Sequence, residues 1–287
     1  MHSVESHPDI RRQELARQYA RRVRWLSLAK LAVVGTVLLA LIFSDISTRF
    51  GNVLGLHQPW ASALYFLVLA VGLGVVTMPL TYYQGFVLPR RYGLSSQKFS
   101  SWLADRAKVA ALAIVLGGVA TVMVYWFLAN FPDVWWLWAG ISLALVSILL
   151  TQLTPILLLP LFFKLEPLAD MELKERLMKL AKKAGTRLAD VVTIDLGSKS
   201  TAANAMLAGL GNTRRIIISD TLVQQYSPEE VEVIMAHELA HHLHRDIPKL
   251  IAVQTVTIVL AFYAADWALR AGASWLGYTG IADVAAF

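Results

Sequence analysis

Long uncharged apolar segments constrain this chain more than any other feature of its sequence. Three of them, Trp60–Leu80, Val109–Phe131 and Val134–Phe163, contain no charged residue. Roughly 20 apolar residues in a helix cross the hydrocarbon core of a bilayer. Two further segments, Leu26–Phe43 and Leu250–Leu269, come near that length. Because 56% of the residues are hydrophobic and only 16% are charged, the sequence predicts a polytopic α-helical membrane protein with five spans.

The first and fourth segments need separate interpretation. Six arginines precede the first one, a pattern that also fits a cleaved signal peptide. Its apolar run is long and no small-residue cleavage site follows, so we expect the segment to be retained. The fourth segment is too long for one upright span and carries Pro155 and Pro160. We expect it to kink or to leave the bilayer as a partly buried element.

The basic residues indicate how the chain is oriented. Lys and Arg concentrate in short cytoplasmic loops. They precede the first span and lie between the second and third: Arg11, Arg12, Arg17, Arg21, Arg22, Arg24, Arg90, Arg91, Lys98, Arg106 and Lys108. The opposite loops hold only Arg49. We therefore expect the N-terminus and the segment after the fourth span on the cytoplasmic side, and we discount nucleic acid as a partner despite the net charge of +6.

A polar domain is predicted to begin at Lys164, where charge density rises abruptly. The segment Leu168–Ala184 has apolar residues at helical spacing and is followed by Gly185, as in an amphipathic surface helix. The stretches DVVTIDLG and RRIIISD then have the composition of strands. This order of elements predicts an α+β domain.

A helix is predicted over residues 228–246. Ser227 is a suitable N-cap, Pro228 fits the first helical position, and Glu230 completes a capping box. The helix carries the pattern H-E-x-x-H at His237, Glu238 and His241. Because a helix turns once in about 3.6 residues, the two imidazoles share a face one turn apart and can converge on one ion.

This pattern suits a catalytic zinc ion. Two neutral imidazoles leave zinc open for water, and the adjoining carboxylate can accept that water's proton. The chain has no cysteine, so imidazole and carboxylate are the ligand types available. A chance match is the alternative, but the motif lies mid-helix, behind a cap and two strands. We predict one zinc ion per chain, with His237 and His241 as ligands and Glu238 as catalytic base.

Three neighbouring residues are predicted not to bind this ion. His244 lies seven residues after His237, a rise of about 10.5 Å along a helix, which is too far for one ion that His241 also binds. His242 and Asp246 point away from the shared face. A catalytic zinc normally takes three protein ligands, and the helix supplies two.

Several blocks of the sequence resemble a known family. PLTYYQGFVLPRRYGLSSQKFSSWLADRAK (79–108), LTPILLLPLFFKLEPLAD, and TAANAMLAGLGNTRRIIISDTLV followed by EVEVIMAHELAHH resemble the integral-membrane zinc peptidases. That group includes the type 1 CAAX prenyl endopeptidases and, more distantly, the bacterial heat-shock membrane peptidase HtpX. The blocks occur in the same order and spacing, which makes the resemblance more specific than the zinc motif alone.

The resemblance implies that the polar domain, which the basic loops predict on the cytoplasmic side, is a gluzincin-like zinc peptidase domain. It also implies that Asn204 and Ala205 lie on an edge strand beside the active site, where an extended substrate adds its backbone as another strand. For Asn204, a turn or strand-end role remains the alternative. The expected organisation is a basic tail (1–25), a four-span domain (26–163), the peptidase domain (164–248) and a fifth span with a truncated end (249–287).

One departure from the family concerns the third ligand. The resemblance implies a glutamate well downstream of the zinc helix, but after His241 the only acids are Asp246, Asp266 and Asp283, and none matches it in context. Either the sequence stops before that ligand or the protein binds zinc poorly. We favour the first explanation, because the ending GYTGIADVAAF has no feature of a natural finish. The chain by itself would then be inactive.

Three functions remain open from the sequence. The first is a membrane zinc endopeptidase of the CAAX prenyl protease type, which cuts a peptide or protein substrate that is prenylated or membrane-embedded. The second is an HtpX-like protease that removes damaged membrane proteins. The third is a catalytically silent membrane scaffold that lacks the third ligand. All three place the chain in a lipid bilayer.

Overall fold

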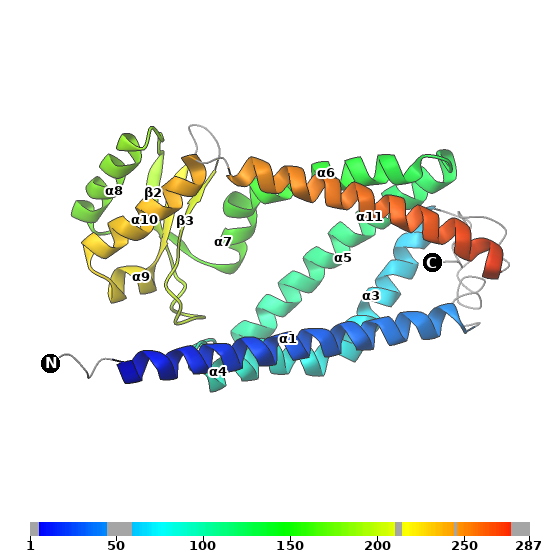
Figure 1. Ribbon diagram of the computed structural model, residues 1–287, viewed down its shortest axis with the longest axis horizontal. Coiled ribbons are helices and arrows are strands. Elements are labelled where there is room, and N and C mark those ends of the chain that lie inside the picture. Colours follow the sequence, from blue (N-terminus) through cyan, green and yellow to red (C-terminus); the bar gives the residue numbers. More distant parts are fainter. Residues whose placement is uncertain (1–5, 45–58, 210–213, 244–245, 277–287) are drawn as a thin grey trace. The chain divides into compact units, whose positions relative to one another are not determined.

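The computed structural model describes residues 6–44, 59–209, 214–243 and 246–276 (Figure 1). The chain divides into two compact units, Met1–Trp135 with Ala268–Phe287, and Trp136–Trp267. The domain bounds expected from the sequence stay a prediction, because this division follows packing between helices rather than the change in charge density at Lys164.

Among the described residues, five helices are long and apolar enough to cross a membrane: α1 (Ser6–Ile42), α3 (Pro59–Tyr82), α5 (Phe99–Asn130), α6 (Trp135–Leu153) and α11 (Asp246–Leu276). Each contains most of one predicted segment, so the five predicted spans are confirmed as helices. Several helices run beyond the apolar residues. Helix α1 begins at Ser6 rather than Leu26, because Arg, Gln, Glu and Ala are good helix formers and continue the helix into the basic tail.

In the first unit, α3 and α5 pack closely because a glycine replaces a side chain at their contact. A Cβ atom on Gly117 would lie 2.2 Å from the ring of Phe66. A Cβ on the neighbouring Gly118 would meet no atom within 4 Å. Helix α1 joins α3 through the ammonium of Lys30, which donates a hydrogen bond to the hydroxyl of Thr81 at 3.1 Å.

An aromatic cluster closes one end of the α3–α5 pair. Helix α3 continues into the π-helix η1 (Tyr83–Val87) and the short α4 (Leu88–Arg91). The rings of Tyr82, Phe86 and Phe99 surround Trp102, which is 2% exposed. These residues belong to the segment 79–108 that carries part of the family resemblance, so in this structure that segment forms a packed turn between two membrane helices.

The fourth apolar segment changes helix type at its first proline. Helix α6 ends at Leu153, the π-helix η2 covers Thr154–Leu158, and α7 covers Leu159–Phe162. Pro155 lies within η2, and proline removes one backbone donor from a helix. Helix α7 turns away from the axis of α6 (Figure 1). The predicted interruption of this segment is therefore confirmed.

The second unit contains a four-stranded sheet. Its strands are β1 (Leu165–Pro167), β2 (Asp190–Ile194), β3 (Ala205–Ala208) and β4 (Arg215–Ser219), in the order β1-β2-β4-β3. Strands β2 and β4 are parallel, and the two outer strands are antiparallel to their neighbours. The two strands predicted from DVVTIDLG and RRIIISD are confirmed as β2 and β4.

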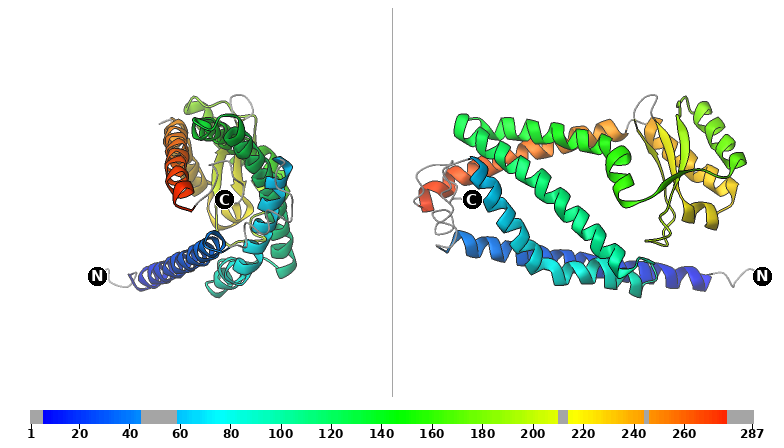
Figure 2. Two further views of the ribbon diagram at one scale, coloured as in Figure 1. Left: turned by 90° about the vertical axis from the view of Figure 1, so that its right-hand side faces the viewer. Right: turned by 180° about the vertical axis from the view of Figure 1, so that it is seen from behind.

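Helices cover both faces of the sheet. Figures 1 and 2 show α8 (Met171–Lys183) and α10 (Pro228–Leu243) on one face and α7 on the other. Helix α8 starts at an N-cap, Asp170, whose carboxyl accepts a hydrogen bond from the N–H of Leu173, and it is followed by Gly185 at φ 66°. The predicted amphipathic helix is thus confirmed, although it starts three residues later than Leu168.

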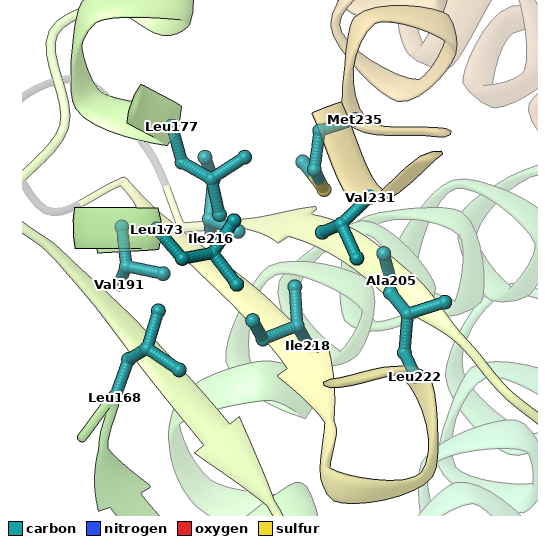
Figure 3. Packing of buried hydrophobic residues seen from close by; sticks show 10 residues of the cluster. All are labelled: Leu168, Leu173, Leu177, Val191, Ala205, Ile216, Ile218, Leu222, Val231 and Met235. Atoms are coloured by element: carbon teal, nitrogen blue, oxygen red, sulfur yellow. The ribbon is translucent and has the colours of Figure 1, made fainter. Parts of the chain in front are cut away.

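Successive residues of β2 and β4 alternate between two cores, because strand side chains point to opposite faces in turn. Val191, Ile216 and Ile218 are buried against α8 and α10 (Figure 3). Val192 and Ile217 are buried on the other face. There they form a second core, against which Leu159 of α7 and Phe163, the residue after α7, pack. The short helix α9 (Asp220–Gln225) follows β4 and adds Leu222 to the first core. The sheet is buried on both sides.

Replacing Gly117 should separate α3 from α5. Gly117→Val places branched carbons where the ring of Phe66 lies, and overpacking of this kind costs about 1–3 kcal/mol. Gly118→Val is the matched control, since nothing lies near its Cβ position. Thermal unfolding of the purified protein should show a lower midpoint for Gly117→Val alone. Adding Phe66→Ala should restore part of the loss, and an equal loss in both valine variants would refute this packing.

Candidate metal and substrate site

Helix α10 begins with the capping box that the sequence predicts. The N–H of Ser227 donates to Oε2 of Glu230 at 2.8 Å, and the N–H of Glu230 donates to Oγ of Ser227 at 3.3 Å. Two backbone donors that have no partner within the helix are thereby satisfied. Pro228 occupies the first helical position, where its missing N–H costs nothing.

The buried face of α10 fixes how the helix lies on the sheet. Val231, Met235 and Leu239, spaced four residues apart, are at most 1% exposed. The helix packs against α8 and β3. His237 is exposed and Glu238 is half-buried. The motif therefore starts on the side of the helix that does not enter the core.

The structure places both predicted histidine ligands on one unbroken helix. His237 and His241 both belong to α10, which runs to Leu243, so they are one turn apart along the backbone. The side chain of His241 lies outside the described residues. The interpretations of His242 and His244 also fall there, as do the side chain of Asp246 and all of Asp283.

A metal ion fits the donor chemistry of this helix. The helix provides two imidazole residues at the required spacing and one carboxyl group between them, and the sequence has no thiol. Among the residues that the structure describes, no group of three or more His, Cys, Asp or Glu gathers to hold an ion. The third ligand is therefore not assigned within this part of the chain.

Strand β3 is the edge of the sheet nearest to α10. It is last in the strand order, and α10 packs against it. Ala205 is its first residue and Asn204 directly precedes it. Asn204 is exposed, whereas Ala205 is 7% exposed and belongs to the core. A substrate at this edge would therefore meet the main chain of Ala205 and not its methyl group.

Asn204 is held by residue 219 on the neighbouring strand. The N–H of Asn204 donates to Oγ of Ser219 at 2.9 Å, and the N–H of Ser219 donates to the carbonyl of Asn204 at 2.9 Å. These bonds continue the β3–β4 ladder by one residue. The backbone of Asn204 is thus ordered as part of the sheet, although the residue itself precedes the strand.

An exposed charge cluster joins α8 to the first turn of α10. Both Arg176–Glu229 and Arg176–Glu172 are 2.8 Å ion pairs. Hydrogen bonding to its own backbone N–H, and then to Arg176, lowers the pKa of Glu229. Donating hydrogen bonds to the carboxylates of Glu229 and Glu172 raises the pKa of Arg176. Because these groups are exposed, the cluster orients the two helices more than it stabilises them.

Sequence reasoning missed this connection. The pair Glu172–Arg176 has the four-residue spacing that signals a helix surface pair, and this spacing could have been noticed. The pairing with Glu229, 53 residues further on, has no local signal.

The comparisons with known proteins agree with this arrangement. Residues 4–164 match the family described as CAAX prenyl protease N-terminal, five membrane helices, and residues 167–285 match peptidase family M48. The chain belongs to the M48 family of membrane metallopeptidases. It is an integral, multi-pass membrane protein with an α+β domain, as the sequence predicted, and its family implies a metal cofactor.

Individual relatives show the same similarity. CAAX prenyl protease 1 of Saccharomyces cerevisiae is 32% identical over 204 residues, which are 70% of this chain and 45% of that protein. An uncharacterized metalloprotease of Bacillus subtilis is 26% identical over 202 residues, which are 70% of this chain and 47% of that protein. The chain spans about half the length of these curated relatives.

A solved structure has the same fold. The crystal structure of S. mikatae Ste24p superposes with a TM-score of 0.77 at 26% identity. The match covers 88% of this chain and 61% of that one. Both the membrane helices and the α+β domain thus have a counterpart in a known structure.

Removing the capping box should loosen the start of α10. Ser227→Ala deletes the acceptor for the N–H of Glu230, and losses of this type cost about 1 kcal/mol. We expect a lower midpoint of thermal unfolding and faster hydrogen exchange in the first turn of α10. Gln224→Ala, a change at an exposed residue of α9, serves as the control. Equal behaviour of the two variants would contradict the capping role of Ser227.

Proposed function

We propose that this protein is a membrane-embedded zinc endopeptidase of the CAAX prenyl protease 1 type. The observation that carries the proposal is the H-E-x-x-H pattern on α10, a helix that packs directly against the edge strand β3. A metal-binding helix beside the edge strand of a sheet is what cleavage of an extended peptide requires. Membership of the M48 family supports the same reaction class.

In this proposal the residues of α10 divide the chemistry between them. His237 and His241 hold the zinc ion through neutral imidazoles. When bound, zinc acts as a Lewis acid on the substrate carbonyl and makes water more acidic. Glu238 accepts a proton from the attacking water and returns it to the departing amine.

The edge strand orients the substrate. An extended peptide would pair with the outer edge of β3 through its main chain, beginning at Asn204 and Ala205. Main-chain hydrogen bonds tolerate many side chains, so this contact supplies alignment and not sequence preference. Asn204, which is exposed, is the residue of this pair whose side chain can also contact the substrate.

The basic loops support a cytoplasmic location for this site. Arginines lie in the first half of α1, and further arginines and lysines lie between α3 and α5, which favours the cytoplasmic side for those ends. Helices α5 and α6 return the chain to that side before β1. The substrate would then be a cytoplasmic or membrane-embedded protein. The yeast relative's name, CAAX prenyl protease 1, favours a prenylated C-terminal peptide.

Loss of the carboxyl group at position 238 should abolish cleavage without releasing the metal. Glu238→Gln removes the proton acceptor, and general base catalysis contributes at least about a hundredfold in rate. Zinc content per chain, measured on full-length protein purified without chelators, should stay unchanged. Glu232→Gln makes the same chemical change on the same helix and should keep activity. Full activity of Glu238→Gln, or wild-type protein without zinc, would refute the proposal.

The client can be identified by direct competition between substrates. We expect a farnesylated C-terminal peptide to be cut faster than the same peptide without the lipid, because the site belongs to a CAAX prenyl protease-like protein. Preference for an unfolded membrane protein would instead indicate a quality-control protease. No cleavage of either substrate by zinc-loaded protein would indicate a silent scaffold.

A further inference from the structure

The segment 195–204, here called the connecting loop, joins β2 to the edge strand β3. It contains no helix or strand and ends at Asn204, where the proposed substrate edge begins. A loop of this kind has the freedom to move unless side chains restrain it. Such restraints come from three successive residues where β4 ends and α9 begins: Ser219, Asp220 and Thr221.

Asp220 holds the first half of the connecting loop. Its Oδ1 accepts hydrogen bonds from the N–H groups of Leu196 at 3.0 Å and Gly197 at 2.9 Å, and from that of Thr221 at 2.8 Å. A Cβ atom on Gly197 would lie 2.9 Å from Oδ2 of Asp220. The loop therefore approaches this carboxyl group as closely as only glycine allows.

Ser219 and Thr221 hold the second half. Oγ of Ser219, which is fully buried, accepts a hydrogen bond from the N–H of Asn204. Oγ1 of Thr221, which is 5% exposed, donates to the carbonyl of Ala202 at 2.7 Å. Together with Asp220, these residues fix both ends of the connecting loop to the start of α9.

Lys199, in the middle of the loop, reaches the end of α7. Its ammonium donates a hydrogen bond to the carbonyl of Phe162 at 2.6 Å and lies 4.7 Å from the centre of the Phe163 ring. Phe162 is the last residue of α7, the final helix in the fourth apolar segment. The connecting loop thus contacts the end of a membrane segment on one side and leads directly into β3 on the other.

We propose that Asp220 is a positioning residue for substrate binding, which rests on the proposed function of β3 as the substrate edge. By accepting two backbone hydrogen bonds from the connecting loop, it sets the path of that loop and therefore the place where Asn204 and Ala205 begin the strand. Without the Asp220 carboxyl group, the N–H groups of Leu196 and Gly197 each lose a hydrogen bond to it. The N–H of Leu196 keeps its bond to the carbonyl of Ile194, so the loop stays folded but is held less firmly. Helix α10 takes no part in these bonds, so the chemical step is spared.

The test separates substrate binding from chemistry in the full-length, zinc-loaded protein. For Asp220→Ala we expect KM for a farnesylated peptide to rise about tenfold, the size of effect that a lost part-buried hydrogen bond to a charged group has. The kcat should stay within about twofold. Hydrogen exchange of the amides in 196–204 should become faster, and zinc content should not change.

Two further variants distinguish positioning from charge or misfolding. Asp220→Asn keeps an acceptor oxygen and should recover most of the lost affinity. In Gly197→Ala the added methyl group comes too close to Oδ2 of Asp220. We therefore expect KM to rise in this variant as well. If Asp220→Ala does not fold, these two variants carry the comparison. An Asp220→Asn variant as impaired as Asp220→Ala would overturn the proposal.

Asp195→Ala is the matched control in the same loop. Asp195 accepts one longer bond, 3.3 Å, from the N–H of Ser198, so its KM should stay near that of the wild type. A KM effect equal to that of Asp220→Ala, or a fall in kcat with unchanged KM, would overturn the positioning role. If wild-type protein cleaves no peptide, the proposed function fails. The exchange rates of Asp220→Ala and Asp195→Ala then still decide whether Asp220 holds the loop.

Discussion

Burial of the small sheet on both faces is the constraint on which the rest of the α+β domain depends. Val191 and Ile216 face α8 and α10, and Ile217 faces the residues around α7. Each fully buried aliphatic side chain contributes about 1.5–3 kcal/mol. Because Val231 and Met235 of α10 enter the same core as Val191 and Ile216, the helix has little freedom to rotate. The position of the metal-binding motif therefore follows from hydrophobic packing.

The parts of this fold that could be predicted are those that local sequence determines. The start of α10 depends on residues three positions apart, and the membrane spans depend on continuous apolar composition. Strand β3 had no such signal, since AMLA is short and lacks β-branched residues; its edge position came from resemblance. The bonds from Leu196 and Gly197 to Asp220 span more than 20 residues, so only the folded chain brings them together.

The membrane helices show the same limit. Hydropathy locates a span, but it does not tell which side of the helix meets a neighbour. Gly117 and Gly118 are adjacent and chemically identical, yet only the first lies against Phe66. Small residues at helix contacts allow close approach in a bilayer. That role becomes visible only once the partner helix is placed, because both glycines suit a span equally well.

Strand β3 has a cost that follows from its openness. Most sheets protect an outer strand with charge, proline or a bulge, since unpaired backbone groups recruit any extended chain. The sequence AMLA of β3 contains neither a charged residue nor a proline. A strand that must pair with an extended substrate cannot carry the features that prevent such pairing. Its brevity then remains as its protection, because a strand of four residues offers few backbone groups to another copy of the protein.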